Sequence, residues 1–360
     1  MTTTTTGDDV LVFPPIWLRD NCPCEHCRDP RNGQKLFGIT DLPADLTVRG
    51  TEVSADTITV TFGPDGHRGP FSRAWLDAQL SASSGDGRTE AGKRLWQAQD
   101  LDGRLPAADW AAYRDDPAER ARVLSAVRDL GFALLHGTPT EEETVLAIAR
   151  TFGYPRETNY GTLFDVRVEP DPSNLAFTGM RIAPHTDNPY RDPVPTLQLL
   201  HCLANAADGG DSGLVDGFTA ASLLRAEDEE AFRILSTTLV PFAWYDAGTS
   251  LRADRPLIDV DPEGHLREVR FNNRSMQALR LDPAATTAFY AAYRRFAEII
   301  ARPELLLTFR LDPGDCVIFD NTRLLHARTA FAESGARHLQ GCYADLDALT
   351  STLRTLEGTA

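Results

Sequence analysis

Two histidines and one aspartate in the second half of the chain have the residue types of a mononuclear iron site. His185 and Asp187 form a histidine-x-aspartate pair, and in an extended segment residues i and i+2 point to the same side. Pro184 and Pro189 disfavour a helix interior, so we expect a strand end or a loop here. His326 is the candidate third ligand. Two imidazoles and one carboxylate occupy one face of an octahedral Fe(II) ion, which leaves the opposite face for a bidentate oxo acid and O2. Because such pairs also occur by chance, a capped loop with a surface histidine is the competing interpretation.

An arginine follows His326 by eleven residues. Arg337 stands just before an apolar run that we expect to form a strand. A guanidinium holds a carboxylate through two parallel hydrogen bonds. We therefore predict that Arg337 binds the far carboxylate of 2-oxoglutarate while the oxo-acid end of the same molecule chelates Fe(II). A surface salt bridge is the alternative role for this arginine.

Three cysteines within six residues indicate a second metal site near the start of the chain. Cys22, Cys24 and Cys27 offer three thiolates, and His67 follows in a glycine-rich turn. Three sulfurs and one imidazole make a closed tetrahedral zinc site, which is structural rather than catalytic. His26 competes with His67 for the fourth position. Three reduced cysteines in a loop are the alternative interpretation.

Composition and charge limit the classes of function. The chain has 360 residues, which allows a small N-terminal zinc-binding domain at 1–95 and a catalytic domain at 96–360, joined near the glycine- and serine-rich residues 81–92. A net charge of −16 opposes the phosphate backbone of nucleic acids. No apolar run approaches the ~18 residues that span a bilayer. The threonine-rich start lacks the pattern of a signal peptide, so we expect a cytoplasmic protein with neither a nucleic-acid nor a membrane partner.

Signals for helices occur in parts of the chain other than the segments that contain the candidate ligands. Asp116 precedes a proline and begins a helix that Gly131 ends. Thr140 and Glu143 form a capping box for the next helix. An aspartate and a proline also open a helix at 283–300.

Strand-like runs account for much of the remaining chain. The runs are residues 57–62, 132–135, 196–203, 305–311, 315–319 and 339–343. The turn at 312–315 predicts a hairpin between the two runs that flank it. Strands separated by long helical inserts favour a mainly β catalytic domain with flanking helices, namely a double-stranded β-helix (jelly roll). The N-terminal domain is expected to be a small zinc-binding β domain.

Several motifs occur in register along nearly the whole chain. They are WLRDNCPC (17–24), HTD (185–187), QLLHC (198–202), GGD (209–211), VDGF (215–218), FNN (271–273), DN and RLLH (320–326), and RHL and GCY (337–343). Together they resemble the family of gamma-butyrobetaine dioxygenase and trimethyllysine dioxygenase. The resemblance implies a jelly-roll fold, Fe(II), 2-oxoglutarate, a structural zinc ion completed by His67, and a homodimer. By position, it also implies that His185, Asp187 and His326 bind iron and that Arg337 binds 2-oxoglutarate.

The same resemblance implies an aromatic cage for a quaternary ammonium, formed by Tyr160, Phe164, Phe177 and Tyr343. A quaternary ammonium donates no conventional hydrogen bond and is held by aromatic faces instead. Phe164 and Phe177 depart from the animal pattern, in which we expect larger or hydroxylated residues, so the cation should be held less tightly. Packing in a core is the alternative role for each ring.

Asparagines complete the implied substrate site. Asn174 and one of Asn272 or Asn273 donate, by the same resemblance, hydrogen bonds to the substrate carboxylate, although loop capping is a competing role. The favoured reaction is the O2-dependent hydroxylation of gamma-butyrobetaine to L-carnitine. Trimethyllysine, a trimethylammonium phosphonate and a natural-product intermediate are alternative zwitterionic substrates. A non-oxidative metal-dependent jelly-roll enzyme, or a binding module, is the alternative from another class.

Overall fold

The computed structural model describes residues 13–83, 92–101, 103–167, 179–246, 248–331 and 336–358. The chain divides into two compact units, Met1–Arg88 and Thr89–Ala360. The predicted linker at 81–92 lies mostly outside the described residues. Within the described ranges, no helix has the length and apolar character needed to cross a membrane.

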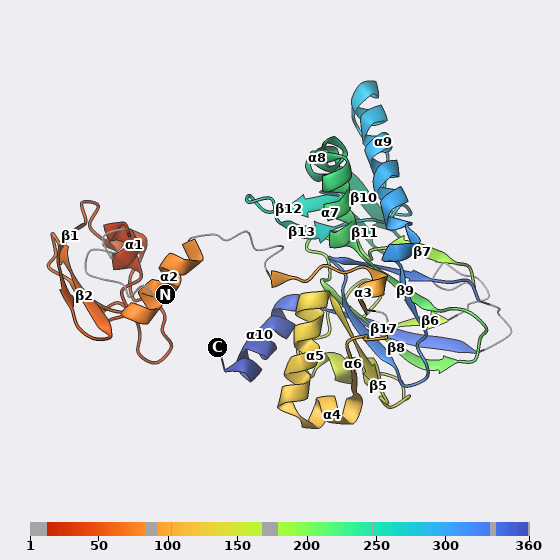
Figure 1. Ribbon diagram of the computed structural model, residues 1–360, viewed down its shortest axis with the longest axis horizontal. Helices are drawn as coiled ribbons and strands as arrows, with labels where there is room; N and C mark the ends of the chain where they lie inside the picture. The colour runs from red at the N-terminus through yellow and green to blue at the C-terminus, as the bar shows by residue number, and fades with distance from the viewer. Residues whose placement is uncertain are drawn as a thin grey trace. The chain divides into compact units, whose positions relative to one another are not determined.

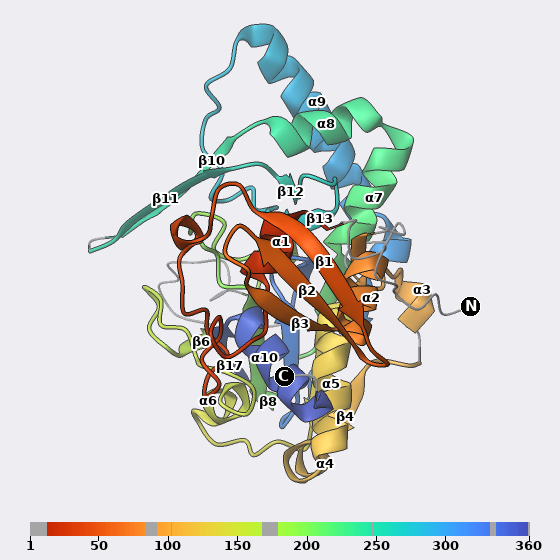
Figure 2. The same ribbon diagram turned by 90° about the vertical axis from the view of Figure 1, so that its left-hand side faces the viewer.

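The first unit contains a three-stranded antiparallel sheet with the order β1 (Thr47–Val53), β2 (Thr57–Gly63) and β3 (Arg68–Ser72), shown in Figure 2. The predicted alternation of β2 is confirmed, because Ile58, Val60 and Phe62 are fully buried between half-exposed threonines. The short helices of this unit are α1 (Pro15–Asp20), the 3-10 helix η2 (Ile39–Asp41) and α2 (Arg73–Ser83).

The second unit is built on two packed sheets, which confirms the predicted jelly-roll class. The larger sheet has the order β4 (Ala107–Asp109), β5 (Phe132–His136), β15 (Cys316–Asp320), β8 (Leu197–Asn205), β17 (Arg337–Ala344) and β6 (Phe164–Arg167). The smaller sheet has the order β14 (Leu307–Phe309), β9 (Ser212–Asp216), β16 (Leu324–Arg328) and β7 (Ile182–His185). All neighbouring strands in these two sheets are antiparallel except β4 and β5.

Strand β5 shows how the larger sheet is buried on both faces. Phe132 and Leu134 join the apolar cluster between the two sheets, which includes Leu214 of the smaller sheet. Ala133 and Leu135 point to the opposite face, where they pack against helices. The helices around that face are α4 (Trp110–Asp115), α5 (Pro117–Leu130), α6 (Thr144–Ala149) and α10 (Leu346–Glu357), as Figure 1 shows.

A long insert between β9 and β14 forms a separate layer of helices and hairpins. Its helices, which gather together in Figures 1 and 2, are α7 (Gly217–Glu227), α8 (Glu229–Thr237) and α9 (Pro283–Ile300). Its two hairpins pair β10 (Val240–Tyr245) with β11 (Ser250–Arg255), and β12 (Ile258–Val260) with β13 (Leu266–Val269). This insert matters for function because it supplies several residues of the cavity described below.

The start of the second unit precedes the boundary expected from the sequence. Lys93 and Leu95, which we assigned to the first domain, pack within the second unit, where the Lys93 ammonium lies 3.3 Å from Asp320. A short helix, α3 (Ala98–Leu101), follows.

The predicted helix after Asp116 is confirmed as α5. The Asp116 carboxylate accepts a hydrogen bond from the Ala118 amide, and Gly131 ends the helix with a φ of 89°. The predicted capping box before α6 is wrong. Glu143 itself caps that helix without a side-chain bond, and its backbone amide donates to the side chain of Gln340.

The predicted hairpin around residues 312–315 is also wrong, although the turn exists. A short 3-10 helix, η5 (Pro303–Leu305), leads into β14, which pairs with β9 in the smaller sheet, whereas β15 pairs with β5 and β8 in the larger one. The turn therefore carries the chain from one sheet to the other. Local turn residues do not reveal which partner each flanking strand will find.

Candidate active site

Two neighbouring strands of the smaller sheet bring the predicted iron ligands together. In the antiparallel pairing of β16 with β7, His326 lies opposite His185, and their ring centroids are 4.1 Å apart. Asp187 follows β7, and its backbone is held by hydrogen bonds in both directions with the side chain of Asn321. The candidate ligand atoms of the two histidines and the aspartate lie within 4.8 Å of one another. This spacing fits one metal ion bound by two imidazoles and a carboxylate.

The protonation states of these side chains suit metal binding. Burial, together with the nearby His185, lowers the pKa of His326 to about 3. Although burial alone would raise it, the pKa of Asp187 lies below its usual value because His326, His185 and Arg274 favour the carboxylate. His185 Nδ1 donates to the carbonyl of Ala183 at 3.0 Å, so its Nε2 keeps the lone pair that a metal needs.

Arg337 lies at the start of β17 and lines the same cavity. One of its terminal nitrogens donates to the Gly210 carbonyl, while Nε is buried without a partner among the described residues. A Cβ on Gly210, which has a φ of +74°, would lie only 2.9 Å from that Nε.

Arg337 and Arg328 both stack on the ring of Phe331, at 5.1 and 4.8 Å from its centroid. Burial and the charge of Arg337 lower the pKa of Arg328 to about 10, so an anionic group is the ligand that this corner would stabilise.

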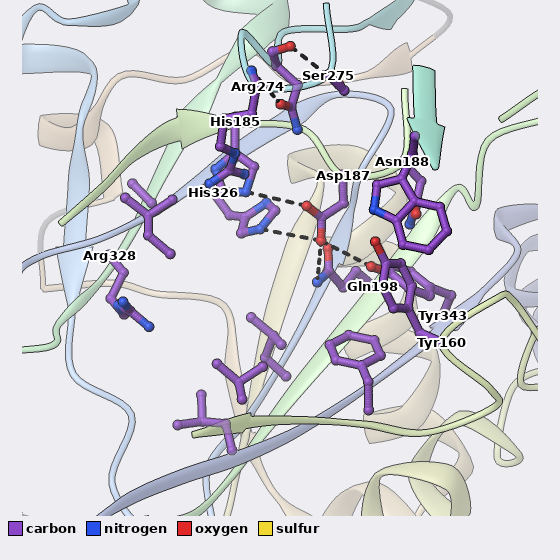
Figure 3. Close-up of a pocket in the computed structure, with 18 of the residues that line it drawn as sticks. Tyr160, His185, Asp187, Asn188, Gln198, Arg274, Ser275, His326, Arg328 and Tyr343 are labelled. Atoms are coloured by element: carbon purple, nitrogen blue, oxygen red, sulfur yellow. Dashed lines mark hydrogen bonds and ion pairs between the residues drawn. The ribbon is translucent and has the colours of Figure 1, made fainter. Parts of the chain in front are cut away.

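The cavity that contains these residues has a volume of about 210 Å³. Figure 3 shows Arg328 on one side of the two histidines, and Tyr160 and Tyr343 on the other side of Asp187. Besides the two histidines and the two arginines, its lining includes Tyr160, Phe164, Asp187, Asn188, Tyr190, Gln198, Trp244, Asn272, Arg274 and Tyr343.

Aromatic rings form the side of the cavity away from Arg328. Three of the four predicted cage residues lie there, and the rings of Phe164 and Tyr343 are 5.1 Å apart. Phe177 lies outside the described residues. Two further rings were missed by the sequence reasoning: Trp244 meets Tyr160 edge-on at 5.5 Å and stacks on Tyr190 at 6.1 Å.

Trp244 could not be found from spacing, because it lies on β10 of the insert, far along the chain from the cage motifs. Its only local signal was a tryptophan in a short apolar run, which is equally typical of a core strand. Tyr190 offered a better signal, since it follows Asp187 by three residues. Its hydroxyl pairs with that of Tyr160 at 2.9 Å and donates to Asn188.

The predicted carboxylate-binding asparagines occupy three different situations. Asn272 lines the cavity, but its amide donates to the Thr186 carbonyl and accepts from the Arg274 backbone, which is a loop-capping role. Asn273 is exposed, does not line the cavity and accepts a hydrogen bond from Tyr293. Asn174 lies outside the described residues. The sequence reasoning missed Arg274, an exposed cation in the lining that is close enough to favour the Asp187 carboxylate.

The first unit brings the second predicted metal cluster together. His67 Nε2 lies 3.3, 3.6 and 3.5 Å from the sulfurs of Cys22, Cys24 and Cys27. His67, and not the exposed His26, completes the group whose ligand atoms all lie within 4.8 Å of one another. Three thiolates around Zn²⁺ leave one negative charge, and the Arg19 guanidinium donates to Cys27 Sγ at 3.0 Å. The donor set fits a closed structural zinc site.

Comparison with solved structures supports the fold of the second unit. A structure of asparagine oxygenase in complex with Fe(II), 2S,3S-3-hydroxyasparagine and succinate matches with a TM-score of 0.51 and 19% identity, over 66% of this chain and 82% of that one. A taurine dioxygenase from Burkholderia xenovorans matches with a TM-score of 0.50 and 16% identity, over 67% of this chain and 87% of that one. At these identities the likeness concerns the fold alone.

Sequence relatives cover almost the whole chain. The family model of the taurine catabolism dioxygenase TauD, TfdA family matches residues 90–343, and the gamma-butyrobetaine hydroxylase-like N-terminal model matches residues 5–77. The gamma-butyrobetaine dioxygenases of Pseudomonas sp. (strain AK-1) and Homo sapiens are 39% and 32% identical, over 97% of this chain and 91% and 92% of theirs. The trimethyllysine dioxygenase of Meyerozyma guilliermondii is 29% identical over 97% of this chain and 92% of its own. The chain therefore belongs to the TauD/TfdA family, in the group of the gamma-butyrobetaine and trimethyllysine dioxygenases, and is a 2-oxoglutarate-dependent dioxygenase.

Proposed function

We propose that this enzyme hydroxylates gamma-butyrobetaine to L-carnitine, with His185, Asp187 and His326 as the Fe(II) ligands. The order of groups along one cavity supports this proposal. A buried cationic corner at Arg337 and Arg328 lies at one end, the candidate iron ligands lie in the middle, and aromatic rings lie at the other end. A dianionic co-substrate suits the cationic corner, and a quaternary ammonium suits the rings.

Bound Fe(II) and 2-oxoglutarate supply the activation of O2 and the oxidation of an unactivated C–H bond. The chain's own residues hold the reactants in place. Arg337, whose buried Nε has no partner among the described residues, holds the far carboxylate of 2-oxoglutarate and thereby orients the oxo acid toward the histidines. The rings of Tyr160, Trp244 and Tyr343 hold the trimethylammonium group and keep water away from the reacting carbon.

Arg274 is the residue that we assign to the substrate carboxylate. The side chain of Asn272 is already used within its loop, whereas Arg274 makes no side-chain ion pair or hydrogen bond with the described residues. The positive charge of Arg274 lowers the pKa of both Asp187 and His326, so Arg274 lies near the candidate iron site. A carboxylate at this position would neutralise a cation at the cavity wall.

The same lining favours gamma-butyrobetaine over trimethyllysine, which carries an additional α-ammonium group. The described cavity residues include two carboxylates, those of Asp165 and Asp187. Asp165 is bound by His338 and Gln340, and Asp187 belongs to the candidate iron site. Neither is available to pair with a second ammonium, and Arg274 would repel it.

We also propose that the cluster of Cys22, Cys24, Cys27 and His67 binds a structural zinc ion, and that the enzyme is a cytoplasmic homodimer. The closed donor set supports the first part. The dimer rests on the family resemblance, and light scattering combined with size-exclusion chromatography would test it.

The experiment that tests the proposed reaction measures two products together. The enzyme, loaded with Fe(II), is incubated with 2-oxoglutarate, O2 and a panel that contains gamma-butyrobetaine, trimethyllysine and a trimethylammonium phosphonate. Succinate and hydroxylated product are quantified for the wild type and for His185→Ala.

We expect succinate and L-carnitine in equal amounts from gamma-butyrobetaine, and neither product with His185→Ala. Succinate matched by hydroxytrimethyllysine would replace the proposed substrate and retain the proposed iron site. Equal succinate formation by the wild type and His185→Ala would overturn the assignment of that site.

A further inference from the structure

The two oxygens of the Asp187 carboxylate have different surroundings. Oδ1 lies 3.3 Å from Nε2 of His185 and accepts no hydrogen bond from the described residues of the larger sheet, whereas Oδ2 lies 3.7 Å from Nε2 of His326. Oδ2 accepts two hydrogen bonds, one from Nε2 of Gln198 and one from the hydroxyl of Tyr343, both at 3.1 Å. Figure 3 shows both donors beside Asp187, on the side away from the histidines.

Both donors come from the larger sheet, whereas the two histidines come from the smaller one. Gln198 lies on β8 and Tyr343 on β17, and the two residues are direct partners in the antiparallel register of these strands. They are 2% and 4% exposed, so packing restricts their movement. Asp187 follows β7 of the smaller sheet, so these two hydrogen bonds connect its carboxylate to the larger sheet of the jelly roll.

We infer that Gln198 and Tyr343 are positioning residues, which hold Asp187 Oδ2 so that Oδ1 alone is available to a metal ion. This inference rests on the proposed iron site. A carboxylate that uses both oxygens would take two positions on the metal. With two histidines and a bidentate oxo acid, that would leave no position for O2 on an octahedral ion. Two donors on Oδ2 oppose this arrangement.

The chemistry of each donor supports the assignment. A carboxylate only accepts hydrogen bonds, so the amide of Gln198 must present its NH2 group to Asp187. Its Oε1 is buried without a partner among the described residues, so the contact with Asp187 is the polar interaction that explains a glutamine here. Tyr343 serves two purposes, because its ring packs 5.1 Å from Phe164 in the aromatic wall while its hydroxyl reaches Asp187.

The test uses Gln198→Leu, Tyr343→Phe and the double variant, with Tyr113→Phe as the matched control. Gln198→Leu removes the donor with little change in volume, and Tyr343→Phe keeps the ring. Tyr113 is also a fully buried tyrosine of the second unit, but its hydroxyl bonds to Thr151 and it does not line the cavity. Fe(II) affinity is measured anaerobically by titration, together with the visible absorption that appears when 2-oxoglutarate chelates the bound Fe(II). The melting temperature of the metal-free proteins shows whether each variant folds.

We expect each single variant to weaken Fe(II) binding roughly 10-fold and the double variant up to ~100-fold, the range found when residues that hold metal ligands are removed. The absorption band should also shift, because Asp187 can then use both oxygens. Tyr113→Phe should lower the melting temperature without changing Fe(II) affinity.

Variants that melt earlier but bind Fe(II) as the wild type does, with an unshifted band, would show a merely structural role and overturn the inference. Failure of the wild-type protein to bind Fe(II) would be a different result. It would overturn the proposed iron site, and the positioning role with it.

Discussion

Trp244 provides the sharpest test of the aromatic wall, because it distinguishes a cation-binding face from an apolar one. Its ring lines the cavity between Tyr160 and Tyr190, at 5.5 and 6.1 Å from their centroids. The change to be made is Trp244→Leu, which keeps an apolar side chain and removes the π face. Trp244→Phe is the matched variant that keeps a smaller face.

The magnitude follows from the strength of a cation–π contact. Tryptophan gives the strongest such contact, worth about 0.5 kcal/mol when exposed and about 2 kcal/mol when desolvated. Because each 1.4 kcal/mol changes a dissociation constant tenfold, loss of the face should weaken binding by about 2- to 30-fold. Trp244 is half-buried, so we expect roughly a tenfold loss for gamma-butyrobetaine. Trp244→Phe should lose less.

The assay compares gamma-butyrobetaine with 5,5-dimethylhexanoate, in which a carbon atom replaces the quaternary nitrogen. Dissociation constants are measured by calorimetry, without O2, on the enzyme loaded with Fe(II) and 2-oxoglutarate. The cation–π contribution is the loss of affinity for the betaine beyond the loss for this analogue, whose tert-butyl end carries no charge. Equal losses for both ligands would refute the cation–π reasoning, and no loss for either would remove Trp244 from the substrate site.

Three further outcomes follow from other parts of the structure. Arg337→Leu should raise the KM for 2-oxoglutarate roughly 10- to 100-fold, since charge-assisted hydrogen bonds contribute about 1.5–3 kcal/mol. Arg337→Lys should retain part of the affinity. An unchanged KM for both variants would contradict the assignment of Arg337 to the far carboxylate of 2-oxoglutarate. Burial lowers the pKa of His201 from 6.5 to about 4, so the unfolded chain binds the proton first as the pH falls. The free energy of unfolding should therefore fall by about 3 kcal/mol between pH 6.5 and 4. Urea titrations of His201→Gln, whose amide can take the place of Nε2 as the donor to Thr138, should lack that part of the fall. The rings of Trp17 and Trp75 stack in the first unit with their centroids 5.4 Å apart. Zinc chelation, or Cys24→Ser, should abolish the near-ultraviolet circular dichroism of this stack, because the unit needs the metal to fold. An unchanged spectrum from protein that metal analysis shows to be free of zinc would mean that the first unit folds without zinc.

Local patterns in the sequence determined the elements whose signals lie close together along the chain. The helix α5 was predictable because an aspartate cap, a proline and a terminal glycine all act within one segment. Strand β2 was predictable because burial of one face requires alternation. Candidate ligands could be selected from the sequence for a similar reason: few combinations of residue types bind iron or zinc, and those combinations recur at characteristic spacings.

Pairing between distant strands was decided only by the tertiary structure. The turn at 312–315 looked like a hairpin, yet the strands on its two sides joined different sheets, because each strand found its neighbour through packing far along the chain. The capping box failed because the amide of Glu143 bonds to Gln340, almost two hundred residues away.

Several residues on the substrate side of the cavity could likewise not be predicted from the sequence. Trp244 and Arg274 come from the insert, and Gln198 reaches Asp187 from the opposite sheet. The residue types needed for the chemistry were therefore readable from the sequence alone. Which side chains surround them was decided by the packing of two sheets and an insert, because contacts between segments so far apart leave no periodic or local trace in the chain.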